Sequence, residues 1–170
     1  MIDPIDFTVD ALSTKRYSQW EKARQSIWYG SRFEQLRNMS SRKKGAEGEK
    51  MCSEIMTSLG HEVKKPKSKE HDRIITPWKT EIKLSTSWNE ELDNFTWQQL
   101  RNQDYERCIF IGVNPEQLKM WWCTKDDLFE HVIGKDSKRQ HAGKDGEQDL
   151  YWIQASAGET WFRTMNTWND

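Results

Sequence analysis

Apolar residues recur at helical spacing in the first third of the chain. An apolar face that includes Trp20, Ile27 and Trp28 predicts a helix over about residues 13–37, interrupted by a glycine. A second amphipathic helix is predicted through GEKMCSEIMTSLG (residues 48–60), which ends at its last glycine. The apolar stripe of this second helix consists of Cys52, Ile55, Met56 and Leu59.

Apolar and polar residues alternate in the middle of the chain, as is typical of strands. This alternation predicts a short strand near residues 61–64 and a hairpin with strands near 71–76 and 79–86. Further strands are predicted at RCIFIGV (107–113), LKMWW (118–122) and DLYWIQAS (149–156), and helices at TWQQLRNQ (96–103) and TKDDLFEHVI (124–133), the latter capped by Thr124. The order of these elements predicts an α/β or α+β fold with a mixed sheet.

Composition adds the scale of the fold and its charge. The chain has 170 residues, a net charge of −1 and ten tryptophans, which indicates one domain with an aromatic-rich core. Eight basic and four acidic residues lie between residues 42 and 69. Four basic residues and one acidic residue lie between 134 and 144. Such runs are either solvated faces or contacts for an anionic partner.

Several classes of protein are not favoured by this sequence. The three cysteines are far apart and form no CxxC pair, which fits a reducing compartment. We found no apolar leader and no run of membrane-spanning length, so we expect a cytoplasmic protein with no membrane partner. A G-x-x-x-x-G-K-[ST] loop is missing, so no nucleotide cofactor is expected.

The hairpin HDRIITPWKTEIKLSTSW (residues 71–88) carries three charges where apolar side chains are usual. If Pro77 and Trp78 are the central residues of a two-residue turn, Asp72 lies opposite Lys83 and diagonal to Glu81 on one face. One interpretation is a solvent-facing hairpin stabilised by an ion pair. The other is a divalent cation, held by the two carboxylates and by the carbonyl oxygen between them, that of Ile82.

A glutamate on the helix at 48–60 offers a further carboxylate. Glu49 falls about 70° from the centre of the apolar stripe, whereas Glu47 and Glu54 fall about 130° or more away. Glu49 is therefore expected at the margin of the face that packs on the sheet. Its partner is either a metal-bound water or Lys83, unless it is an ordinary glutamate that reaches out to solvent.

The order of these residues resembles that of the PD-(D/E)xK nuclease superfamily, which includes many type II restriction endonucleases and archaeal Holliday-junction resolvases. KGAEGEKMCSEIMTSLGHEV is similar to the opening helix of the resolvases, with Glu49 in the glutamate position. HDRII resembles the Pro-Asp strand, with His71 in place of the proline, and EIKLS resembles the Glu-x-Lys strand. The resemblance covers about residues 42–132.

The resemblance implies an α/β restriction-endonuclease-like domain over residues 41–170, with a mixed central sheet flanked by helices. Residues 1–40 have no counterpart in the resemblance, and their apolar pattern predicts a helical extension. It further implies hydrolysis of DNA by a water that Mg²⁺ activates, with Mn²⁺ as a substitute. Asp72, Glu81 and the Ile82 carbonyl would hold the metal, and Lys83 would orient the water. Glu49 would bind a metal-coordinated water or a second ion, and Gln99 or its neighbour Gln98 would steady Lys83 or a phosphate.

The expected substrate is double-stranded DNA, cut by a type II restriction-like homodimer in a microbial or phage setting. Two alternatives stay open: a structure-specific nuclease, either a junction resolvase or a repair nickase, and a non-catalytic DNA-binding module. Basic and polar residues that flank the predicted site would contact DNA. They are Arg42, Lys43, Lys44, Lys65, Lys67, Lys69, Lys138, Arg139, Gln140 and His141.

Overall fold

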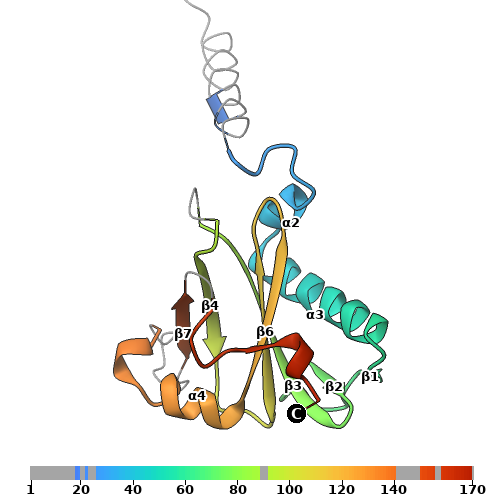
Figure 1. Ribbon diagram of the computed structural model, residues 1–170. Coiled ribbons are helices and arrows are strands. Elements are labelled where there is room, and N and C mark those ends of the chain that lie inside the picture. The colour runs from blue at the N-terminus through green and yellow to red at the C-terminus, as the bar shows by residue number, and fades with distance from the viewer. Residues whose placement is uncertain are drawn as a thin grey trace, which may run out of the picture.

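The computed structural model describes residues 18, 19, 22, 26–88, 92–140, 150–155 and 158–169. A mixed six-stranded sheet lies at its centre (Figure 1). Its strand order is β1-β2-β3-β5-β6-β8. Only the β3–β5 pair is parallel. The strands are β1 (Val63–Lys64), β2 (Arg73–Ile75), β3 (Trp78–Thr86), β5 (Arg107–Val113), β6 (Leu118–Thr124) and β8 (Arg163–Thr164). The prediction of an α/β fold with a mixed central sheet is confirmed.

Two further layers cover this sheet. Helix α3 (Ser41–Ser58) lies along one face, with the short helix α2 (Glu34–Asn38) at its amino-terminal end. A two-stranded sheet of β4 (Phe95–Leu100) and β7 (Tyr151–Ala155) lies on the other side with helix α4 (Lys125–His131), as Figure 1 shows. Single 3-10 turns lie at Asp136–Lys138 and Met165–Thr167. None of the helices in these described ranges combines the length and apolarity needed to cross a membrane.

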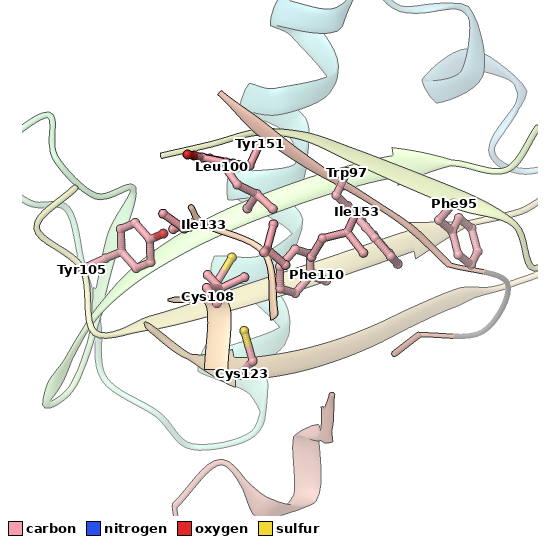
Figure 2. Close-up of a cluster of buried hydrophobic side chains, with 12 residues drawn as sticks. Phe95, Trp97, Leu100, Tyr105, Cys108, Phe110, Cys123, Ile133, Tyr151 and Ile153 are labelled. Carbon is pink, nitrogen blue, oxygen red and sulfur yellow. The ribbon is translucent and has the colours of Figure 1, made fainter. Parts of the chain in front are cut away.

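Successive side chains of β3 point to opposite faces of the sheet, and a separate hydrophobic cluster lies on each face. Ile82 and Leu84 face α3, where a Cβ atom added at Gly48 would lie 2.8 Å from the Leu84 Cβ. The helix therefore approaches the strand closely at a residue that has no side chain. Phe110 and Trp97 pack on the opposite face in an aromatic group that also contains two cysteines (Figure 2). Each residue of β3 is thus assigned to one of two faces by its position in the strand.

The segment that follows β3 is a strand, so the prediction of a helix at residues 96–103 was wrong. Phe95 and Trp97 alternate with polar neighbours and are fully buried, where they pack against β5 and β6. Gln99 has a φ angle of 59° and lies where the β4–β7 register shifts. This irregularity turns Leu100 back into the core, which keeps three large side chains buried on one face.

The helical predictions met different outcomes. Much of the predicted helix at 13–37 lies outside the described residues, and residues 26–33 form turns rather than a helix. Helix α3 begins at Ser41, earlier than predicted, and Leu59 is exposed rather than part of its apolar stripe. The cap of α4 is confirmed, because Thr124 and Asp127 form a reciprocal capping box.

The turn between β2 and β3 differs by one residue from the predicted turn. Ile75 pairs with Trp78, so the two turn residues are Thr76 and Pro77, which are joined by a cis peptide bond. Extension of this register places Asp72 opposite Glu81 rather than opposite Lys83. When a two-residue turn moves by one position, the residue opposite Asp72 changes by two positions, here from 83 to 81. Residues two apart on a strand point to the same face, so Asp72 stays on the predicted face.

A buried arginine, Arg107, contacts three segments that are distant in sequence, on the α3 side of the sheet. The Arg107 Cζ lies 4.0 Å from the ring centroid of Trp78, 4.2 Å from that of Trp122 and 4.9 Å from that of Trp168. Its guanidinium also donates to the Trp168 carbonyl oxygen. Because aromatic faces attract cations, this cage stabilises the hairpin, β6 and the carboxyl-terminal segment around one charge.

Candidate active site

Strand β3 continues past the end of β2 and leaves an edge open. β2 accompanies β3 only from Trp78 to Thr80, and no other strand of the described ranges covers that edge beyond Thr80. The Asp72 backbone N–H donates to the Thr80 carbonyl oxygen at 3.1 Å. The Asp72 Oδ2 then accepts the Ile82 N–H at 2.8 Å, so a carboxylate takes the place of the next ladder bond.

This bond also fixes the direction of the Ile82 carbonyl. The N–H and C=O groups of one strand residue point to the same edge, because pairs of residues in a ladder exchange both bonds. The Ile82 carbonyl oxygen therefore points to the open edge, where the Asp72 carboxylate lies. An oxygen-rich position thus forms where β2 and β3 part.

Glu81 and Lys83 lie beside this position as a close ion pair. The Lys83 Nζ is 2.6 Å from the Glu81 Oε1, and the side chains are 18% and 9% exposed. Both residues are paired in register with β5 residues of the aromatic core, Cys108 and Phe110. The ion pair that one interpretation of the hairpin predicted is therefore present, but it is buried, so the solvent-facing part of that interpretation was wrong.

The environment acts on the two charges in opposite ways. Burial raises the pKa of Glu81, the neighbouring Asp72 raises it further, and Lys83 opposes both without cancelling them. Burial also disfavours the charged form of Lys83, but the Glu81 carboxylate outweighs it, so the pKa of Lys83 is raised. Lys83 is thus held protonated in this arrangement, as a hydrogen-bond donor rather than a base.

Glu49 lies at the margin of α3 as predicted, but neither expected partner is the one observed. Its side chain is 32% exposed, and its Oε2 accepts a hydrogen bond of 2.8 Å from the Arg73 Nη1. The same Nη1 donates to the Asp72 carbonyl oxygen at 2.6 Å, and the Arg73 Nε donates to the Ser53 Oγ at 2.9 Å. Arg73 therefore stands between Glu49 and the Asp72 backbone, where a metal-bound water or Lys83 was expected.

Arg73 was missed by sequence reasoning, although two signals could have identified it. Arg73 pairs with Thr80, so it faces α3, and Glu49 and Ser53 are one helical turn apart on that face. His71 was noted only as a replacement for proline. Its side chain is 6% exposed, and neither ring nitrogen has a hydrogen-bond partner within the described part of the chain.

Gln99, the predicted helper of Lys83, lies at the irregularity of β4 and is exposed. Its backbone N–H donates to the Gln140 Oε1 at 3.3 Å, and the Gln140 Nε2 donates to the Gln98 Oε1 at 3.2 Å. The contacts of both glutamines are therefore with the segment before β7. The expectation that they steady Lys83 has no support in these contacts.

The residues predicted to contact DNA occupy three places. One group lies in the first turn of α3, another lies between β1 and β2, and the third follows α4. Burial and then the nearby cation Arg37 lower the pKa of Lys44. The exposed members are Arg42, Lys43, Lys65, Lys67, Lys69 and Arg139; Lys44, Lys138 and Gln140 are half-buried; His141 lies outside the described residues.

The donor set at the open edge fits a hard cation. Mg²⁺ in proteins commonly takes one or two carboxylates and completes its coordination with water and substrate phosphate. Asp72 and Glu81 supply the carboxylates, and the Ile82 carbonyl supplies a third oxygen. Across the described ranges, no three acidic, histidine or cysteine side chains converge in a metal-binding group. The fit therefore rests on two carboxylates and a backbone oxygen.

Comparisons with known proteins give no family for this chain. No protein-family model matches it, no curated protein matches it, and no solved structure matches it. The geometry of the open edge is therefore the basis on which function is argued.

Proposed function

We propose that this protein is a metal-dependent endonuclease that hydrolyses DNA phosphodiester bonds, with a restriction-endonuclease-like version of the α/β fold. One observation carries the proposal: Asp72, Glu81 and Lys83 lie together at the edge of β3 that β2 no longer covers. Two carboxylates and a protonated lysine meet beside an outward-pointing carbonyl. Charged side chains are rarely fully buried unless they are paired, and groups whose pKa values are shifted by burial and by a charged partner cluster at functional sites.

Each residue has a role in this proposal. Asp72 and Glu81, with the Ile82 carbonyl, would hold Mg²⁺ or Mn²⁺, which supplies a water of lowered pKa and neutralises charge on the phosphate. Asp72 is fixed in place because its other oxygen accepts the Ile82 N–H. Lys83 would donate to the scissile phosphate or to the attacking water and so align the two.

The Glu81–Lys83 distance of 2.6 Å gives a second candidate function some support. A lysine that already neutralises a buried carboxylate lowers the need for a metal there. The protein would then be a DNA-binding module without catalytic activity. That function predicts salt-sensitive binding to DNA and no cleavage with either Mg²⁺ or Mn²⁺.

The finer parts of the proposal concern the substrate and the assembly. A restriction-like enzyme that cuts both strands of duplex DNA with one site per chain would act as a homodimer. A junction resolvase or a repair nickase would use the same chemistry on a different DNA shape. Cleavage of linear duplex compared with four-way junctions separates these enzymes.

The test is cleavage of plasmid DNA with Mg²⁺, followed by sequencing of the ends. Asp72→Asn keeps an oxygen that can accept the Ile82 N–H but removes the negative charge, and Lys83→Ala removes the proposed donor. Both variants should lose cleavage by about 100-fold or more, because each removes a group that acts in the transition state. Lys79→Ala, on the same strand but in an exposed ion pair with Asp104, is the matched control. Equal activity of all three variants and the wild type would contradict the site.

A further inference from the structure

A hollow of about 530 Å³ lies on the α3 side of the first hairpin, away from the Glu81–Lys83 pair. It opens between the last turns of α3 and the strands β1 and β2. Its charged lining consists of Lys64, Lys65, Arg73 and Glu54, and its remaining walls include Thr57 and Ser58. The lining itself thus holds three cations and one carboxylate, while Glu49 and Glu62, which pair with Arg73 and Lys64, lie outside it.

The cations of this hollow retain capacity to bind an anion. The hydrogen bonds of Arg73 use its Nε and Nη1 groups, and its Nη2 makes no hydrogen bond to any described residue. Lys65 is exposed and has neither an ion pair nor a hydrogen bond in the same part of the chain. Glu62 lies 2.8 Å from the Lys64 ammonium, and the single carboxylate of the lining, Glu54, lies 4.0 Å from Lys50 outside it.

We propose that this hollow binds a backbone phosphate of the nucleic-acid substrate through Arg73 and Lys65. A guanidinium with a free amino group and an adjoining ammonium is the usual recognition set for a phosphate oxygen pair. Such a contact reads no base, so it contributes affinity and position rather than sequence preference. This inference rests on the proposed nuclease function and names a second place where the substrate is held.

Arg73 gives the hollow a direct connection to the proposed active site. The same guanidinium donates to the Asp72 carbonyl oxygen at 2.6 Å, and Asp72 holds the edge at Ile82. A phosphate on Arg73 would therefore lie one side chain away from the residue that positions the metal. The hollow would fix the path of a strand that passes over the open edge of β3.

The experiment measures equilibrium binding of a linear duplex across a series of potassium chloride concentrations. All variants carry Asp72→Asn, so that cleavage does not interfere. Lys65→Ala should weaken binding equally for unrelated sequences and reduce the slope of log K against log salt by about 1. The double variant Lys64→Ala/Lys65→Ala should reduce that slope by about 2 at most. Ser58→Glu, which adds a carboxylate to the wall of the hollow, should weaken DNA binding several-fold. Lys135→Ala, an exposed lysine after α4, should leave the slope unchanged.

The outcomes separate this inference from the proposed function. Unchanged slopes for both lysine variants, with wild-type cleavage of plasmid in Mg²⁺, would overturn the phosphate site and leave the nuclease standing. Absence of both cleavage and DNA binding in the wild type would overturn the two together. A loss of slope in Lys135→Ala equal to that in Lys65→Ala would also overturn the site, because the effect would then be one of overall charge.

Discussion

Replacement of Lys83 by methionine gives a sharp test of the buried ion pair. Methionine keeps most of the length of the side chain and removes its charge, so Glu81 is left without its partner. Both side chains are less than one-fifth exposed, so water screens the lost attraction poorly. Loss of one partner of a buried pair costs about 3–5 kcal/mol of the free energy of unfolding. In a domain of this size the corresponding fall in Tm is about 6–20 °C.

The same variant should show a characteristic dependence on pH. Burial and Asp72 already raise the pKa of Glu81, and loss of Lys83 removes the influence that opposes them. A carboxyl with a higher pKa in the folded state binds more protons when folded, so the folded state gains stability as the pH falls. The penalty of Lys83→Met should therefore be full above the folded pKa of Glu81. It should shrink as the pH is lowered towards the unfolded value of about 4.3.

The assay is urea unfolding followed by tryptophan fluorescence, in EDTA, at neutral and at mildly acidic pH. Glu81→Leu/Lys83→Met should recover most of the lost stability, because an apolar pair of similar volume removes the unpaired charge. Lys79→Met, which breaks the half-exposed pair with Asp104 on the same strand, should cost less than about 1 kcal/mol. If Lys83→Met costs no more than Lys79→Met, the pair is not shielded from water and the reasoning fails.

Three further predictions follow from helix α3. Gly48→Ala should lower the free energy of unfolding, measured in urea, by about 1–3 kcal/mol, because its methyl group would lie 2.8 Å from a β3 Cβ atom. Gly45→Ala, whose methyl group would have nothing within 4 Å, should raise the free energy of unfolding by up to about 1 kcal/mol. The reverse order of the two effects would contradict the packing of α3 on β3. Glu49→Ala should reduce plasmid cleavage by about 10–100-fold through loss of its hold on the arginine beside it, and Glu47→Ala should reduce it little, so equal effects would refute the assigned helix face. Burial raises the pKa of Cys52 to about 12, so a thiol reagent at mildly alkaline pH should label this residue only after unfolding. Rapid labelling of Cys52 in the native protein would contradict the burial of its thiol.

Strong local patterns were enough to predict much of the sheet from sequence. The run at 107–113, apolar after Arg107, became β5, which is buried on both faces, and the cap at Thr124 followed from its own four residues. The pairing of Asp72 with the Glu-x-Lys strand was also predictable, because either turn position puts its carboxyl on the same face. These features depend on residues that are close in sequence.

The features that sequence did not disclose depend on distant partners. Residues 96–103 contain good helix formers, and burial of Phe95 and Trp97 against β5 overrides that preference. Arg73 lies 24 positions from Glu49, so its hydrogen bond to that carboxylate depends on how α3 settles on the hairpin. Alternation along the hairpin puts Arg73 on the face towards α3, but only the packing of that helix brings Glu49 within reach of its guanidinium.

The bond between the Asp72 carboxylate and the Ile82 N–H has a consequence for self-association. An exposed strand edge invites a second chain to add a strand, and natural sheets discourage this with charges turned towards the edge. Here the first donor beyond β2 is already occupied, and the group that occupies it is anionic and cannot donate to an incoming strand. Asp72, which is proposed to act in catalysis, thus also opposes the addition of a second chain at this edge of the sheet. A substitution of Asp72 is therefore expected to lower solubility even where the fold survives.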